Sequence, residues 1–302
     1  MAVYVNTNVS SLNGRRYLNN VQNQLTTTYQ RLSSGLRINS AKDDAAGLQI
    51  SSRLTTQING LNQGNRNASD GIALAQTIEG AMDEMTGMLQ KIRTLAVQAN
   101  NGTNTADDRK ALQKEATALA AEITRIAQQT KFAGGQILDG GHGVMTKGGT
   151  GQGSNSIGKM TLQVGANKGD TISFEVQAMK FSQIGIGGVG DTELKKFWSK
   201  DKGIVFTKAE NIGAAISAMD KMIGLVDGAR AGLGAMQNRL ESSIRNQANV
   251  SANQADARSR IRDADFAEES ANLSQQSIIQ QAASSMLMQA NTRPQLGLSL
   301  LG

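Results

Sequence analysis

Few side chains in this chain could do chemistry, and no motif groups them. The one histidine, His142, lies in the glycine-rich stretch GGHG; with no second histidine and no HExxH, it lacks the partners of a protease-type zinc site. Adjacent acidic residues, which could do general acid–base work, occur at Asp43-Asp44, Asp107-Asp108 and Glu268-Glu269. All three pairs fall near expected helix starts or on polar faces, where capping and solvation explain them. Cysteine and GxxxxGK[ST] are absent, so we expect no enzyme, no cofactor and no metal.

Composition and charge argue against two further classes of partner. The chain has 302 residues and a net charge of +6, but its basic residues are scattered and only 3% of residues are aromatic, which disfavours nucleic-acid binding. No apolar run approaches the ~18 residues of a membrane span, and the N-terminal stretch lacks the apolar core of a Sec signal. Its five basic residues without an acid up to residue 42 are also typical of organellar transit peptides. The helical register there favours a structural role instead.

A polar interruption, RLSSGLRINSAKDDAAGLQIS (31–51), separates two helical patterns. The pattern before it is a heptad seam of Leu18, Val21, Leu25, Thr28 and Leu32. Gly35 then stands where a left-handed helix C-cap is expected. Ser40 precedes Asp43 by three residues, as in a capping box, and Asp43 and Asp44 in a first turn would suit the helix dipole. The stretch predicts a joint between helical segments, with Gly35, Ser40, Asp43 and Asp44 as its main residues.

Long helical seams follow the joint. The first contains Ala75, Ile78, Met82, Met85, Leu89, Ile92, Ala96 and Ala99, and a shorter one contains Leu112, Ala116, Leu119, Ile123 and Ile126. Thr105 and Asp108 between them predict a second capping box, and the short loop predicts antiparallel helices. Met82, Met85 and Met88 could form an adaptable binding groove, but their register favours core packing.

The middle of the chain changes character and the last third is helical again. Residues 131–207 hold 17 of the 33 glycines without a helical period, and MTLQVGANKGDTISFEV predicts a β-hairpin. Helical spacing returns from Ile212 to Ile244. A final helix carries Phe266, Leu273, Ile279, Met286 and Leu287. The predicted fold is mainly α: an elongated antiparallel helical coiled-coil rod of N- and C-terminal segments, with a small β-hairpin-rich central region.

The two ends of the chain lack the contacts to fold alone. Burying the apolar side chains of residues 1–32 recovers less free energy than ordering that segment costs, and a pair of terminal helices would leave one apolar flank of each exposed. A dense assembly core would exclude unpaired charge, and charge is almost absent near both ends. We therefore hypothesise that both termini are disordered in the monomer and fold on association with copies of the same chain. Head-to-tail contacts that do not close into a ring give a helical filament.

Several long motifs resemble those of bacterial flagellins. RLSSGLRINSAKDDAAGLQIS is similar to the joint motif of that family, NASDGIALAQTIEGAMDEMTGMLQKIRTLAVQ and GAMQNRLESSIRN to its core blocks, and ARSRIRDADFAEESANLSQQSIIQQAASSMLMQAN with LSLLG to its C-terminal end. The likeness covers roughly residues 1–140 and 205–302. It implies a flagellar filament subunit with three parts: an inner core domain of residues 1–44 and 256–302, a helical rod of 45–140 and 205–255, and a glycine-rich hairpin region of 141–204 with little or no outer domain. The polymerisation seams would then be Leu18, Val21, Leu25, Leu32, Phe266, Leu273, Ile279, Met286 and Leu287.

The resemblance also implies partners and a location. Flagellins are exported unfolded by the flagellar type III apparatus, without a cleaved Sec signal, and polymerise outside the cell beneath a cap protein, next to hook-junction proteins. Their C-terminal helix, here about Asp265 to Leu301, is bound by an export chaperone. The region contacted by the toll-like flagellin receptor corresponds here to Lys91, Ile92, Leu95, Gln98 and Glu115, with Lys91 in place of the usual arginine and Thr94 in place of an acid. Lysine does not reproduce the bidentate fork of arginine, so weaker recognition is expected.

The central loop offers candidate modification sites, and two alternative functions remain open. Thr146, Thr150, Ser154 and Ser156, in a loop expected to be exposed, are candidates for O-linked sugars. A hook-filament junction or capping-type protein that shares the terminal helices is one alternative function. An enzyme carried on the filament is the other, although the short middle segment without HExxH disfavours it.

Overall fold

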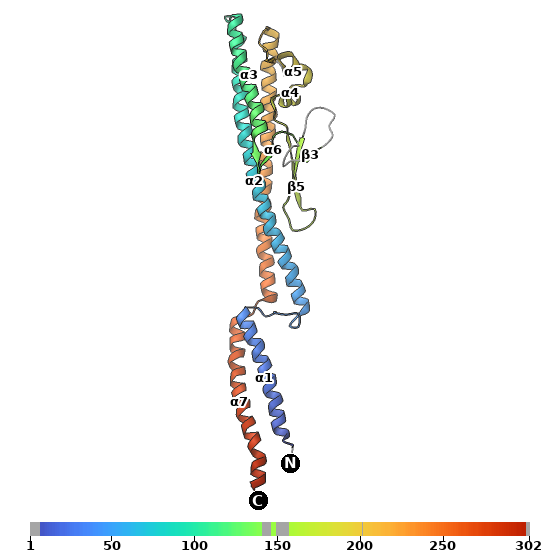
Figure 1. Cartoon of the computed structure of the whole chain (residues 1–302), viewed down its shortest axis with the longest axis vertical. Helices are drawn as coiled ribbons and strands as arrows, with labels where there is room; N and C mark the ends of the chain where they lie inside the picture. Colours follow the sequence, from blue (N-terminus) through green and yellow to red (C-terminus); the bar gives the residue numbers. More distant parts are fainter. Residues whose placement is uncertain (1–6, 141–145, 149–156, 201, 300–302) are drawn as a thin grey trace. The chain divides into compact units, whose positions relative to one another are not determined.

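The computed structural model describes residues 7–140, 146–148, 157–200 and 202–299, and its contacts divide the chain into two compact units. Unit 1 comprises Met1–Ile58 with Ser251–Gly302, and unit 2 comprises Asn59–Val250. The fold is mainly helical, with a few small antiparallel strand pairs, as predicted (Figure 1). None of the helices in the described ranges is long and apolar enough to cross a membrane. The three-part division by role, with boundaries after residues 44, 140, 204 and 255, stays a prediction.

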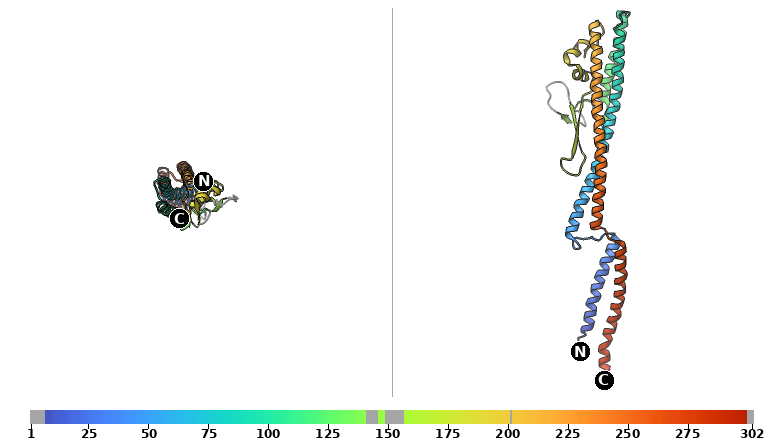
Figure 2. Two further views of the ribbon diagram at one scale, coloured as in Figure 1. Left: turned by 90° about the horizontal axis from the view of Figure 1, so that it is seen from above. Right: turned by 180° about the vertical axis from the view of Figure 1, so that it is seen from behind.

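Unit 1 contains a pair of antiparallel helices, α1 (Val9–Ser34) and α7 (Phe266–Ser299). Contacts near both ends of α1 fix the direction: the Asn8 side-chain amide donates to the carbonyl oxygen of Ala290 at 2.7 Å, and Arg31 pairs with Glu269 at 2.9 Å. Figures 1 and 2 show the two helices side by side in front and rear views. The start of α2 (Ala45–Ala99) and the end of α6 (Ala209–Arg262) also belong to this unit.

Unit 2 is built on α2, α3 (Ala106–Gln129) and α6, with α2 antiparallel to the other two. The predicted seam on α2 is confirmed, because every member is fully buried: Ala75, Ile78, Met82, Met85, Leu89, Ile92, Ala96 and Ala99. On α6 the buried line repeats every seven residues: Ile212, Met219, Val226, Leu233 and Leu240. Met82 and Met85 are therefore core residues rather than the lining of an adaptable groove.

The start of α3 confirms the second predicted capping box. The Thr105 hydroxyl accepts from the backbone N–H of Asp108 at 3.2 Å, and the Thr105 backbone N–H donates to Asp108 Oδ2 at 2.9 Å. The backbone N–H groups of Thr105 and Asp108 are therefore both paired within the motif, as a capping box requires.

The central region contains the predicted hairpin. Short β1 (Lys131–Phe132) and β2 (Gly135–Gln136) form one antiparallel pair, while β3 (Thr146–Gly148), β4 (Ile157–Gln163) and β5 (Thr171–Gln177) form an antiparallel sheet in the order β3-β4-β5. Gly169, with φ of 98°, stands in the β4–β5 turn, where a left-handed conformation favours glycine. The alternating pattern of MTLQVGANKGDTISFEV therefore predicted the strands and the turn correctly.

The hairpin packs closely on α2 through glycines of that helix. A Cβ added to any of three glycines would come closer than 3.0 Å to the hairpin: Gly60 faces Ala166, Gly64 faces Val164, and Gly71 faces Leu162. Between them the Asn67 side-chain amide donates to the carbonyl oxygen of Gln163 at 2.8 Å. The lack of side chains on these glycines lets the strand and its turn approach the helix backbone.

Two short helices in the central region were not predicted. These are α4 (Phe181–Val189) and α5 (Asp191–Phe197), followed by the strand pair β6 (Trp198–Ser199) and β7 (Gly203–Ile204). The glycines of FSQIGIGGVG weaken intrinsic helix propensity, and neither helix is long enough to show a heptad. Tertiary packing overrides that propensity, because Phe181 and Phe197 are fully buried and Gly185 lies against Leu194. The central region is therefore less dominated by hairpins than expected.

Candidate functional site: the terminal helix pair and its joint

The joint begins with Gly35, which ends α1 as predicted. Gly35 has φ of 69° and ψ of 9°, and its backbone N–H donates to the carbonyl oxygen of Arg31 at 2.9 Å. Few residues other than glycine adopt this left-handed conformation without strain. The stop signal read from the sequence is thus a helix C-cap.

The predicted capping box of Ser40 and Asp43 forms its hydrogen bonds but does not start the helix. The backbone N–H and the hydroxyl of Ser40 donate to Asp43 Oδ2 at 2.8 and 3.0 Å, and these bonds, the backbone one first, lower the pKa of Asp43. The helix α2 begins only at Ala45, and Asp44 caps it by accepting from the backbone N–H of Gly47 at 2.9 Å. The first-turn prediction for Asp43 and Asp44 was wrong, because a turn over residues 41–43 intervenes before the helix.

The polar residues of the joint satisfy backbone groups at several helix ends within unit 1. The Arg37 guanidinium donates to the carbonyl oxygen of Ile261 at 2.6 Å, and the Arg37 backbone N–H donates to that of Arg262 at 2.7 Å. Both carbonyl groups lie in the last turn of α6. Asp265 accepts from the backbone N–H of Ala267 at 2.8 Å and so caps α7. Helix ends leave unpaired N–H and C=O groups, which explains why so many polar residues gather in one interruption.

The contact between α1 and α7 is narrow. Of the residues in α1, Val21, Leu25 and Thr28 are buried. Five predicted seam residues are only half-buried, two on α1 and three on α7: Leu18, Leu32, Leu273, Ile279 and Leu287. Phe266 and Met286, also predicted as seam residues, are exposed.

Apolar side chains remain uncovered on both terminal helices. The exposed fractions on α1 are 57% for Tyr17 and 55% for Tyr29, and those on α7 are 67% for Ile278, 70% for Met286 and 65% for Met288. A groove of about 800 Å³ lies between the two helices, with Gly14, Tyr17, Ile279 and Met286 among its lining residues. Exposed apolar surface of this extent is typical of interaction sites. We call these uncovered residues and the groove the terminal apolar surface.

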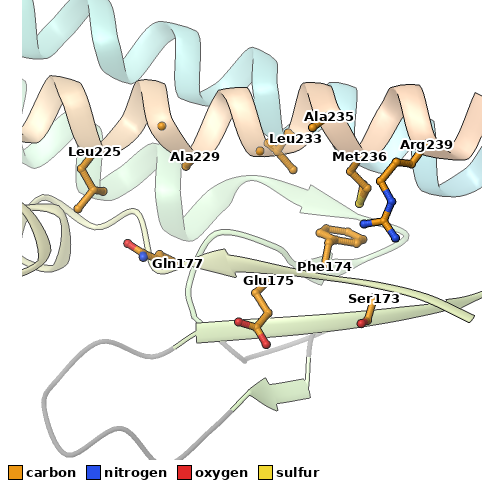
Figure 3. Close-up of a pocket in the computed structure, with 12 residues that line it drawn as sticks. Ser173, Phe174, Glu175, Gln177, Leu225, Ala229, Leu233, Ala235, Met236 and Arg239 are labelled. Atoms are coloured by element: carbon orange, nitrogen blue, oxygen red, sulfur yellow. The ribbon is translucent and has the colours of Figure 1, made fainter.

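Unit 2 has a second groove that the sequence reading missed. It measures about 470 Å³ and lies between β5 and α6 (Figure 3). Phe174 points from β5 toward Met236 and Arg239 of α6, whereas Glu175 points away from the helix. Exposed glycines of α6, among them Gly228 and Gly232, form part of the lining. The run GLVDGARAGLGAM was the available signal, since its small residues leave the helix backbone uncovered.

The five residues of the expected receptor contact do not share one surface. Lys91 Nζ and Glu115 Oε1 form an exposed ion pair of 3.0 Å between α2 and α3, and Gln98 is exposed. Ile92 and Leu95 lie in the core of unit 2. A partner could therefore reach Lys91, Gln98 and Glu115 without disturbing the fold, and the contact itself stays a prediction.

The remaining predicted sites are mostly outside the described residues. His142, Thr150, Ser154 and Ser156 lie outside them, and Thr146 is described only as backbone in β3. O-linked modification at these positions stays a prediction. Within the described ranges, no three His, Asp or Glu side chains are grouped as a metal site would require.

Comparisons with other proteins agree along most of the chain. Two family models match: the bacterial flagellin N-terminal helical region over residues 5–142, and the bacterial flagellin C-terminal helical region over residues 216–301. Polar flagellin C of Vibrio parahaemolyticus serotype O3:K6 is 35% identical and flagellin B of Vibrio cholerae serotype O1 is 36% identical, each alignment covering 100% of both chains. The alignment with polar flagellin C runs over 400 positions, so that relative has residues with no counterpart among the 302 of this chain.

One solved structure shares the fold. The structure of a putative flagellar hook-associated protein from Vibrio parahaemolyticus matches with a TM-score of 0.57 at 16% identity, covering 73% of this chain and 100% of that one. At that level of identity the match concerns architecture and not activity.

Proposed function

Because this chain belongs to the bacterial flagellin family, we propose that it is a structural subunit that polymerises with copies of itself into the helical filament of the bacterial flagellum. As a flagellin it is a structural protein and not an enzyme. The observation that carries self-assembly is the terminal apolar surface, which has no partner within the described part of unit 1. Neighbouring copies of the same helices are apolar in the same way and would cover it.

Disorder of the terminal helices in the monomer is part of this proposal. Only three residues of the 26 in α1 are buried against the rest of the chain, among them the polar Thr28. Such limited burial does not offset the conformational entropy lost when a helix is ordered. Backbone amides of α1 and α7 should therefore exchange with deuterium rapidly in monomer and slowly in filaments. Strong protection of α1 in the monomer would contradict the proposal.

Truncation tests assembly itself. Deleting residues 1–32, or residues 266–302, should abolish salt-induced polymerisation seen by electron microscopy. Unit 2 of the same truncated chains should keep its cooperative thermal unfolding, because its core contains none of the deleted residues. Normal filaments from either truncated chain would show that the terminal helices are not the assembly element.

Export and its partners follow as further proposals from family membership. We infer secretion by the flagellar type III system, growth beneath a cap protein, contact with hook-junction proteins, and chaperone binding to the helix from about Asp265 to Leu301. A chain lacking residues 265–301 should not bind the chaperone, while a chain lacking residues 1–32 should bind it normally. Equal binding by both truncated chains would rule out the C-terminal helix as the chaperone site.

Recognition by the toll-like flagellin receptor is proposed for the exposed residues around the Lys91–Glu115 ion pair. Gln98 lies about two helical turns beyond Lys91 on α2 and is also exposed. A planar arginine would bind a carboxylate or carbonyl partner through two hydrogen bonds where Lys91 offers a point charge. We therefore propose that this chain is recognised less strongly than relatives with arginine there.

A hook-filament junction protein is the second candidate function. The fold shared with the putative hook-associated protein of Vibrio parahaemolyticus is the observation that favours this second candidate. The full-length similarity to proteins named flagellin favours the bulk subunit. Polymerisation of purified protein distinguishes the two: long filaments support the bulk subunit, and short or absent polymers support the junction protein.

A further inference from the structure

The most buried positions of the α1–α7 contact contain polar partnerships. Arg31 Nη1 donates to Glu269 Oε1 at 2.9 Å, and the side chain of Glu269 is only 9% exposed. About one helical turn away, the buried Thr28 hydroxyl donates to Gln276 Oε1 at 3.2 Å. A helix pair held by apolar contact alone does not require these groups, and a buried charge is unfavourable unless it is paired.

The charges on the two helices allow few alternative pairings. The sequence of α1 contains Arg15, Arg16 and Arg31 and no acid, while that of α7 contains Glu268 and Glu269 and no other acid. If α7 slid along α1 by one heptad toward the joint, Arg31 would face Gln276, and Glu269 would pass beyond the end of α1. To meet Arg16 instead, Glu269 would have to move about 15 residues along α1, or ~23 Å. Adjacent registers therefore leave the carboxylate without a cation.

We propose that the Arg31–Glu269 ion pair determines the register in which α1 closes on α7, and so selects the arrangement that the terminal helices adopt in the filament. This inference rests on the proposed assembly function. Arg31 and Glu269 act as specificity-determining residues, with the Thr28–Gln276 hydrogen bond as a second contact in the same register. Single buried polar groups set register in other helical assemblies by the same physical means.

The joint alone discriminates less strongly between registers of α1 on α7 than the ion pair does. The backbone hydrogen bond that links the end of α1 to the residues just before α7, from Ala264 N–H to the Gly35 carbonyl oxygen, is 3.0 Å long, but Gly35 is exposed to solvent. An exposed hydrogen bond that breaks is replaced by one to water at little net cost. A buried carboxylate that loses its guanidinium has no such replacement.

Engineered cysteines can report the register, because the chain has no native cysteine. A Cβ on Gly14 would lie 3.9 Å from the Cβ of Leu287, a separation suited to a disulfide. Gly14→Cys with Leu287→Cys therefore reports the observed register. Val21 lies two turns further along α1, ~11 Å away, so Val21→Cys with Leu287→Cys oxidises only after a slide of one heptad.

The test compares disulfide yields in assembled filaments. With Arg31 and Glu269 intact, the first cysteine pair should oxidise and the second should not. In the Arg31→Met, Glu269→Leu variant, which removes both charges, the ratio of shifted to observed disulfide should rise about tenfold or more. The charge swap Arg31→Glu, Glu269→Arg should keep the observed register. Removing the exposed ion pair of Asp256 and Arg260 by alanine substitution is the matched control and should change nothing.

Each outcome decides the matter. Shifted disulfides in the apolar variant support the proposal, and filaments of that variant with only the observed disulfide overturn it. If the apolar variant does not polymerise, the charge swap decides: assembly in the observed register supports the ion pair, and failure of both variants overturns it. If the unsubstituted chain itself does not polymerise, the proposed function fails rather than this inference.

Discussion

Gly64 of α2 lies against the carbonyl oxygen of Val164, so closely that a Cβ on Gly64 would come within 3.0 Å of that oxygen. The contact is with backbone, which cannot rotate away as a side chain can. Gly64→Ala should therefore push the hairpin off α2 and lower the free energy of unfolding of unit 2 by about 1–3 kcal/mol. Urea unfolding followed by circular dichroism measures this change.

Gly80→Ala on the same helix is the control. Gly80 is exposed and has open space where a Cβ would stand. Alanine there should raise the free energy of unfolding by about 0.5–1 kcal/mol, because glycine disfavours a helix interior. Equal effects of the two substitutions would show that the hairpin does not pack on Gly64 as described.

The capping box of α3 should make unit 2 sensitive to acid. Hydrogen bonds from the Thr105 hydroxyl, and then from its backbone N–H, lower the pKa of Asp108 below its usual range. A carboxyl with a lowered pKa in the folded state stabilises the fold above its unfolded pKa, about 3.9. That stabilisation is lost as the pH falls through the folded pKa. Asp108→Asn should therefore lower the Tm at about pH 6 and have progressively less effect below about pH 4.

A second substitution identifies the source of that pH dependence. In a Thr105→Ala background the hydroxyl that contributes most to the lowered pKa is absent. The pH-dependent part of the Asp108→Asn effect should shrink there. An unchanged pH profile would attribute the effect to groups other than Thr105.

Met286 should matter for assembly and not for the stability of unit 2. Its side chain is 70% exposed, and it lines the groove between α1 and α7. Burial of a methionine against a neighbouring subunit is worth about 1.5–3 kcal/mol. Met286→Ser should therefore raise the critical concentration for polymerisation about tenfold or more. Sedimentation of filaments at graded concentrations measures this, with Gln281→Ser, an exposed polar position on α7, as the control.

Lys91→Arg tests recognition by the innate receptor. The substitution keeps the charge beside Glu115, which Lys91 pairs with at 3.0 Å, and adds a planar bidentate donor. A reporter-cell dose response should shift to lower concentrations of the variant. The same potency for both chains would remove the weakened-recognition prediction.

Heptad patterns predicted the long helices well, because burial of one face dictates both the sequence pattern and the packing. Every residue of the predicted α2 seam, from Ala75 to Ala99, is fully buried. The hairpin and the caps at Gly35 and Thr105 were also predictable, since turn and cap conformations restrict residue type locally. On the terminal helices the same pattern predicted Met286 as a seam residue, although nothing within the described chain covers it.

Other features depend on contacts that no local pattern records. The helix α4 contains three glycines and is ordered by the burial of Phe181 and Ile184 against distant segments. Asp44 caps α2 in place of the Ser40–Asp43 pair. The two candidate caps are adjacent in sequence, and the turn over residues 41–43 decides which of them stands at the start of the helix. The Arg31–Glu269 pair joins residues more than 230 positions apart, which the sequence alone gives no means to align.

Among the described residues, two groups of methionines lie at opposite extremes of exposure, and oxidants should distinguish them. Met82, Met85, Met219 and Met222 are fully buried, whereas Met286 and Met288 present their sulfur-bearing side chains to solvent. Peroxide converts accessible thioethers to polar sulfoxides. Free subunits should therefore be damaged first on α7, the helix that the proposed polymer would shield, so that oxidation before incorporation is more harmful than oxidation afterwards.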